Sequence, residues 1–153
     1  MAFPTSSSAG IFSERWSTIL RTTENMRSLA QRLKDQLDNV AMTVYAHKVG
    51  QFSTTLQSEK GTLDGLVSGA NTGTPSFASY AQGQVSDSGI NIVAEYTSLD
   101  TAHAALISFL DTNLPNIGIY NFSGGVLVPI ELNAVQKAAL STELGTYLAE
   151  FLS

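Results

Sequence analysis

The sequence predicts a mainly α-helical protein: an antiparallel helical bundle with one long N-terminal helix and a small β-hairpin before the C-terminal helix. Apolar residues recur every three or four positions over most of the chain, which is the helical period. Residues 117–130 instead collect β-forming residues around a Gly-Gly pair, as hairpins do. The chain of 153 residues has the length of one domain. We therefore expect residues 13–153 to form a single helical domain.

Residues 1–12 are expected to form an extended N-terminal arm. Ser, Thr, Gly and Pro dominate this stretch, and Phe3, Ile11 and Phe12 are its isolated large apolar residues. Chain termini usually fray unless something ties them down. These three residues are therefore candidate interaction residues, and a neighbouring subunit is the partner that we expect to hold the arm.

The stretch from Trp16 to Tyr45 predicts the long helix, because its apolar stripe is interrupted by neither Gly nor Pro. At about 1.5 Å per residue this helix would be roughly 45 Å long. A compact chain of this size is only about 40 Å across. The helix would then project or pack against another subunit. Arg15 and Arg21 near its start are further candidate interaction residues.

Further helical patterns follow a break expected near residues 47–50. The Asn133 and Gln136 pair resembles a capping box that would open the last helix, and Pro115 is expected to end the helix before it. Two antiparallel helices can bury each other's apolar stripes, so we favour a true break over a kink. The expected helices cover residues 51–67, 76–84, 90–114 and 133–152.

The expected hairpin at 117–130 supplies the other candidate interaction residues. They are the β-forming residues on either side of Ser123-Gly-Gly125: Ile117, Ile119, Phe122, Val126 and Val128. Two strands alone are only marginally stable in water. A partner must therefore cover or extend them, either the bundle itself or a strand edge on another chain.

The charge pattern also favours assembly. Charged residues make up 14% of the chain, whereas about 25% is usual. Residues 1–60 hold seven basic and five acidic residues, a net of +2, and residues 61–153 hold one basic and eight acidic residues, a net of −7. The basic part of one copy can face the acidic part of another. The alternative is that both parts face solvent.

No residue pattern indicates catalysis, a cofactor or a metal, so we do not expect an enzyme. Cysteine is absent and the carboxylates are scattered singly. We expect His103 to be a satisfied core or interface histidine, and His47 to lie structurally at a helix C-terminus. The arginines of the first helix are spread around it, which argues against sequence-specific nucleic-acid binding. Neither a membrane span nor a signal peptide is expected.

One stretch resembles a known group of proteins. Residues 74–84, Thr-Pro-Ser-Phe-Ala-Ser-Tyr-Ala-Gln-Gly-Gln, are followed by Ile-Val-Ala-Glu-Tyr at 92–96 and by a helix that closes at Asn-Leu-Pro, 113–115. Together with the closing helix, this region is similar to small virion structural proteins of tailed bacteriophages. The resemblance covers roughly residues 50–115. It implies a neck or head-to-tail connection in which helical subunits form rings, and it carries over no site residue.

These observations lead to one expected function with alternatives. We expect a structural subunit of a tailed-phage virion, a head-to-tail connector, adaptor or neck-ring protein that acts by oligomeric assembly. Its partners would be further copies of itself in a ring and other virion proteins such as portal or tail components. Its location would be the virion, assembled in the host cytoplasm. The alternatives are a capsid- or tail-accessory virion protein, or a non-viral helical-bundle binding or regulatory protein.

Overall fold

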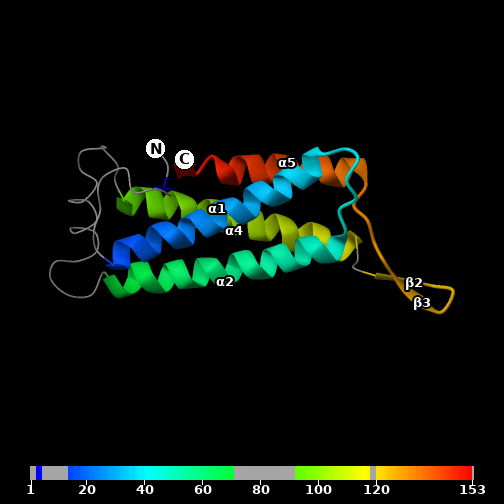
Figure 1. The fold of residues 1–153 in the computed structure, drawn as a ribbon, viewed down its shortest axis with the longest axis horizontal. Helices are drawn as coiled ribbons and strands as arrows, with labels where there is room; N and C mark the ends of the chain where they lie inside the picture. Colours follow the sequence, from blue (N-terminus) through cyan, green and yellow to red (C-terminus); the bar gives the residue numbers. More distant parts are fainter. Residues whose placement is uncertain (1–2, 5–13, 71–91, 118–119, 153) are drawn as a thin grey trace.

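The computed structural model describes residues 3–4, 14–70, 92–117 and 120–152. Four helices pack lengthwise in this part of the chain, and a β-hairpin extends beyond one end of them (Figure 1). The predicted class, a mainly helical bundle, is confirmed. The helices are α1 (Glu14–Asp38), α2 (Ala46–Ala70), α4 (Ile92–Ile117) and α5 (Ala134–Leu148).

The four helices enclose a single apolar core. Helix α1 packs against α2 and α5, and α4 packs against the same two helices from the other side. The apolar residues at helical spacing supply the core, so the periodicity in the sequence marks the buried faces. Its largest fully buried members are Tyr147, Ile19, Met26, Leu56, Leu63, Leu99, Leu106, Leu110 and Leu144.

The prediction of one helix from Trp16 to Tyr45 is wrong at its C-terminal end. Helix α1 stops at Asp38, and the chain turns at Asn39. The Asn39 side chain accepts a hydrogen bond from the backbone N–H of Ala41 at 3.1 Å, and its carbonyl accepts one from Met42 at 3.0 Å. Asn competes with helical hydrogen bonding in this way. Val40, which continued the apparent apolar stripe, is 96% exposed.

The early turn changes the second helix and the conclusion drawn from helix length. Helices α1 and α2 have 25 residues each, so they form a matched antiparallel pair about 38 Å long. Neither needs an outside partner to cover a protruding end. His47 lies in the first turn of α2, whereas the sequence suggested a helix C-terminus.

The helix end predicted at Pro115 is also wrong. Helix α4 runs through Pro115 to Ile117. Proline removes its own N–H donor and crowds the carbonyl four residues earlier, but only two residues of α4 follow Pro115, so little of the helix depends on this turn. The predicted helix at 76–84 lies outside the described residues.

Helix α5 begins as predicted but ends early. The side chain of Asn133 accepts the N–H of Gln136 at 2.9 Å, and the side chain of Gln136 accepts the N–H of Asn133 at 2.8 Å, so the capping box is confirmed. The helix ends at Leu148 rather than continuing to Leu152. Strand β4 (Phe151–Leu152) then pairs in parallel with β1 (Phe3–Pro4). Tertiary pairing of the two chain ends overrides the helical period here.

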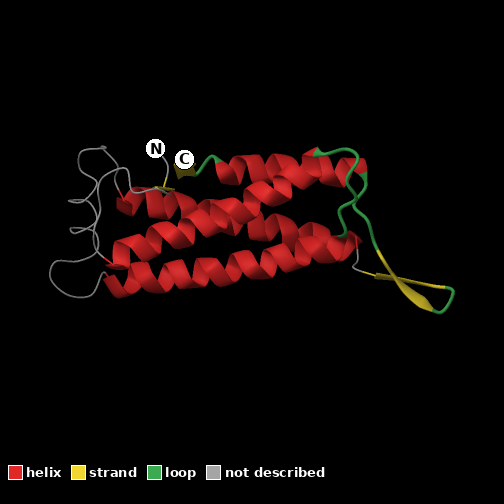
Figure 2. Ribbon diagram, in the orientation of Figure 1, coloured by secondary structure: helices red, strands yellow, loops and turns green. Residues whose placement is uncertain are grey.

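The predicted hairpin is confirmed within narrower limits. Strands β2 (Tyr120–Ser123) and β3 (Val126–Pro129) pair antiparallel, with Phe122 opposite Leu127 (Figure 2). The turn residues Gly124 and Gly125 have φ angles of +59° and +80°. Only glycine adopts such angles readily, and two in succession make the type I′ turn that matches the twist of a hairpin.

Candidate interaction surface

The hairpin carries the main group of exposed apolar side chains in the described chain. Phe122 is 72% exposed, Val126 62% and Leu127 61%, and Tyr120 and Val128 are about half exposed. We call these five side chains the hairpin surface. Because side chains alternate along a strand, Tyr120 and Phe122 lie on one face with Leu127, and the two valines lie on the other. Both faces of the hairpin are therefore apolar.

The base of the hairpin is fixed to the bundle although its tip is not. The N–H of Ala46 donates to the carbonyl of Ile130, and the N–H of Leu132 donates to the carbonyl of Val44, each at 2.8 Å. The His47 ring stacks on Tyr120, with centroids 5.8 Å apart, and on Tyr45 at 5.7 Å. The start of α2 thus sets the direction in which the hairpin projects (Figure 1).

The hairpin carries no charge. No Asp, Glu, Lys or Arg occurs between Asp111 and Glu131. Solvated edge strands usually carry a charged residue that blocks pairing with other chains. Here only Pro129 has that effect, because it lacks a backbone N–H. Contiguous exposed apolar residues of this kind typically mark an interaction site.

The sequence-predicted interaction residues do not all meet at this surface. Three of them, Phe122, Val126 and Val128, lie together on the hairpin. Tyr120 and Leu127 were not among the predicted residues. Counting the strand pairs outward from the Gly-Gly turn would have identified both. The predicted hairpin boundary was wrong for Ile117, which is the last residue of α4.

The remaining predicted residues lie elsewhere. Phe3 lies in β1, where its register partner is Phe151 of the same chain. Arg15 is in the first turn of α1, and Arg21 is exposed farther along the same helix. Ile11, Phe12 and Ile119 lie outside the described residues.

A polar cluster between α2 and α4 is the second candidate site. The Lys60 side chain is only 5% exposed, and its ammonium donates to Asp64 and to Asp100, each at 2.6 Å. The Tyr96 hydroxyl also donates to Asp64. The Lys60 ammonium lies 5.4 Å from the centre of the Tyr96 ring, which adds a cation–π attraction.

Electrostatics show what this cluster can do. Burial acts to lower the pKa of Lys60, but its hydrogen bonds to Asp100 and Asp64 outweigh burial and raise the pKa above its ordinary value. Burial and the bond to Asp64 raise the pKa of Tyr96. Lys60 therefore stays protonated at neutral pH, and it can serve neither as a base nor as a nucleophile. We interpret the cluster as a tie between α2 and α4.

His103 lies beside this cluster in the core. Its burial, as predicted, is confirmed, but its Nδ1 atom has no hydrogen-bond partner among the described residues, so it is not fully satisfied there. Its ring centroid lies 6.3 Å from that of Tyr147, whose buried hydroxyl likewise lacks a partner in the described part. Burial, with a smaller effect of the Lys60 charge, lowers the pKa of His103 to about 4. Within the described ranges, no group of three or more His, Asp or Glu could hold a metal ion.

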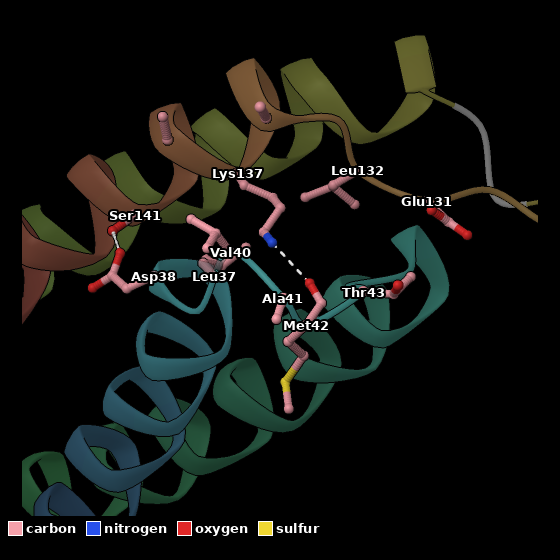
Figure 3. A pocket seen from close by; sticks show the side chains of 12 residues that line it. Leu37, Asp38, Val40, Ala41, Met42, Thr43, Glu131, Leu132, Lys137 and Ser141 are labelled. Atoms are coloured by element: carbon pink, nitrogen blue, oxygen red, sulfur yellow. Dashed lines mark hydrogen bonds between the residues drawn. The ribbon is translucent and has the colours of Figure 1, made fainter.

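A groove where α1 ends and α5 begins has a volume of about 520 Å³. Its polar lining is used for internal contacts (Figure 3). The Lys137 ammonium donates to the carbonyl of Met42 at 2.8 Å and to that of Asn39 at 3.3 Å, and Ser141 donates to Asp38. Lys137 thus fastens the turn after α1 and is not presented to a ligand.

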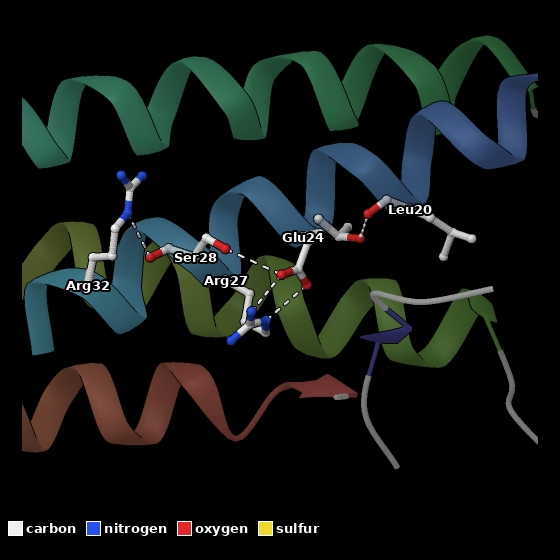
Figure 4. A network of polar contacts seen from close by, with 6 residues as sticks. Leu20, Glu24, Arg27, Ser28 and Arg32 are labelled. Atoms are coloured by element: carbon white, nitrogen blue, oxygen red, sulfur yellow. Dashed lines mark hydrogen bonds and ion pairs between the residues drawn. The ribbon is translucent and has the colours of Figure 1, made fainter. Parts of the chain in front are cut away.

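Two basic residues of α1 form hydrogen bonds within the helix (Figure 4). Arg27 donates two hydrogen bonds to Glu24, at 2.5 and 2.9 Å, and Arg32 donates to the carbonyl of Ser28 at 3.4 Å. The bond to Arg27 lowers the pKa of Glu24. The Arg27–Glu24 pair is already counted in the net charge of +2 of residues 1–60, so it leaves the charge difference between the two parts of the chain unchanged.

No family model, curated protein or solved structure matches this chain. None of the helices described is long and apolar enough to cross a membrane. Only the residues and the geometry of the hairpin surface therefore indicate a function.

Proposed function

We propose that this protein is a structural subunit of a tailed-bacteriophage virion, a connector, adaptor or neck-ring protein that assembles with copies of itself and with portal or tail components. The virion context comes from the sequence resemblance at residues 50–115. The mode of action comes from the structure: a bundle with its own core carries a projecting, uncharged hairpin whose apolar side chains have no cover in the described chain.

The exposure of the hairpin surface is the observation that carries this proposal. A bundle that binds a small ligand would concentrate its apolar exposure around a cavity between helices. Here five of the eight exposed large apolar side chains in the described chain lie on a projection outside the bundle, and the groove at the end of α1 is fastened by Lys137. A role in assembly accounts for both features.

Light scattering tests the assembly step. One chain has a mass of 16.3 kDa, and we expect the purified protein to have a multiple of this mass. Phe122→Ser with Val126→Ser should shift the mass towards one chain, because both side chains leave the proposed contact. Val40→Ser is the matched control: it removes an even more exposed apolar side chain away from the hairpin, and it should leave the mass unchanged.

The virion assignment has its own test. Mixing this protein with the portal protein of the same virion should give a complex larger than either component alone, and the double serine variant should reduce that complex if the ring must form first. A protein that stays monomeric up to high concentration and does not bind the portal protein would overturn the proposal. A monomer that instead binds small molecules would favour the non-viral alternative.

A further inference from the structure

We propose that neighbouring copies join by pairing their hairpins edge to edge, with β2 of one copy against β3 of the next. This inference rests on the proposed function, since it assumes an oligomer and names the contact that builds it. The occupant of each hairpin edge is therefore a second copy of this chain. Backbone geometry and side-chain alternation support the pairing.

The turn determines which peptide groups face outward. A type I′ turn brings the carbonyl of Ser123 to the N–H of Val126, so these residues form a hydrogen-bonded pair. Pairs alternate along an antiparallel ladder, so Phe122 and Leu127 form a non-hydrogen-bonded pair. Their N–H and C=O groups point to the open edges. The same alternation turns the groups of Tyr120 outward, together with the carbonyl of Pro129.

These outward groups match between copies in the register that the hairpin already uses. Phe122 can exchange two hydrogen bonds with the partner's Leu127, and Tyr120 can donate one to the partner's Pro129. A head-to-tail series that closes thus gains about three bonds per copy and leaves no hairpin edge open. Pairing β2 with β2 would give about two bonds per copy and leave every β3 edge exposed.

The side chains favour the same partner. Pairing in this register places Phe122 beside the partner's Leu127, so one apolar face continues from copy to copy. With aromatic side chains burying about 150–250 Å² each, the exposed fractions of the hairpin surface amount to roughly 500 Å². A stable interface needs about 800 Å² from each partner. The hairpin surface is smaller than that, and edge pairing covers only the flanks of its side chains, so other contacts between the copies must supply the rest; no charge on the hairpin has to be desolvated.

A head-to-tail contact also suits a ring. Such a contact uses two different surfaces of one chain, and repetition closes a ring when the rotation allows. The two edges of one hairpin are two different surfaces, because only β3 contains a proline. Each copy would therefore offer β2 to one neighbour and β3 to the other.

Leu127→Pro against Leu127→Ala tests the backbone contact. The Leu127 N–H points outward, so proline removes the donor to the next copy without removing a bond within the hairpin, as Pro129 already does. Alanine removes more of the side chain than proline does but keeps the donor, so a larger loss in L127P must come from the backbone. We expect L127P to raise the dissociation constant of the assembly at least ~10-fold more than L127A does, measured by light scattering across a dilution series.

Single-cysteine chains test which strands meet. The chain has no cysteine, so any disulfide reports the introduced pair. A chain carrying Phe122→Cys, mixed with one carrying Leu127→Cys, should form covalent dimers under mild oxidation, because these positions face each other between copies. The control mixture of F122C with V40C should not. The mixed design excludes links within one chain.

The results separate the two proposals. A parent protein that is monomeric overturns the proposed function together with this contact. A parent that assembles, with L127P and L127A equally assembled and no F122C–L127C link, overturns only the hairpin contact and leaves the oligomer to another surface. A dimer that is insensitive to L127P but lost in Phe122→Pro would show β2–β2 pairing and overturn the head-to-tail register.

Discussion

The Lys60 ammonium lies 2.6 Å from a carboxylate oxygen of Asp100, forty residues further along the chain on helix α4. With Asp64 on its own helix, Asp100 holds a buried positive charge between α2 and α4. The carboxylates are about half exposed, whereas the Lys60 side chain is 5% exposed. The cost of desolvation thus falls mainly on the lysine. Its buried charge is stabilised by hydrogen bonds to both carboxylates.

Removing the partners of Lys60 should destabilise the bundle in steps. We expect Asp100→Asn to lower the free energy of unfolding by about 1 kcal/mol, because Asp64 remains and solvent screens the lost pair. The double change D64N/D100N should cost about 3 kcal/mol, since it strands a buried charge. Urea unfolding measures both. Asp111→Asn, an exposed change on α4, is the control and should stay within about 0.5 kcal/mol.

Acid should weaken the fold through His103. Its pKa in the folded state is lowered to about 4 from 6.5. Because the pKa of His103 is lower in the folded state, the unfolded protein binds this proton more readily. The contribution of neutral His103 to stability is therefore complete above pH 6.5 and is lost as pH falls towards 4. The loss is at most about 3 kcal/mol. Besides Lys60, the groups that face His103 are Asp64, Asp100 and Tyr147.

Unfolding measured between pH 7 and 4 tests this dependence. We expect the stability of His103→Leu to change much less over that range, because leucine suits the apolar stripe and does not titrate. Glu24, whose pKa is lowered by Arg27, should still lose its contribution below about pH 4.5 in both proteins. An equally steep loss in H103L between pH 6.5 and 5 would assign the acid sensitivity to other groups.

Replacing two glycines within α2 should stabilise the protein. Gly61 and Gly65 are exposed in the helix, and a Cβ atom at either position would meet no atom within 4 Å. Gly61→Ala and Gly65→Ala should each stabilise the protein by about 0.5–1 kcal/mol, because alanine loses less backbone entropy in a helix. Thermal unfolding measures the gain. Gly124→Ala has equal space but a φ of +59°, so it should strain the hairpin turn and give no gain.

The capping box of α5 should make a measurable contribution to the free energy of unfolding. Asn133→Ala removes the side-chain acceptor for the N–H of Gln136 and should cost about 1 kcal/mol in urea unfolding. Asn133→Ser keeps an acceptor and should cost less than half as much. Equal losses in the two variants would mean that the cap contributes little and that packing alone fixes the start of α5.

The features that were predicted correctly from the sequence are those that neighbouring residues determine. The helical period, the Asn133 capping box and the Gly-Gly turn each act within a few residues, and each was predicted correctly. The end of the first helix was missed because Val40 and Ala41 fit the apolar period while the Asn39 turn, fastened by Lys137 from α5, exposes them. Part of the hairpin surface was likewise predicted, but strand pairing was needed to add Tyr120 and Leu127.

By itself the sequence determined a helical bundle with a hairpin, because hydrophobic periodicity and turn chemistry are written into neighbouring residues. Only the tertiary structure decided that the hairpin, and not an overlong helix, is what projects from the bundle. It also decided that Lys60 is buried between carboxylates from two helices. Both depend on contacts between residues far apart in the chain, whose burial and partners no local pattern encodes.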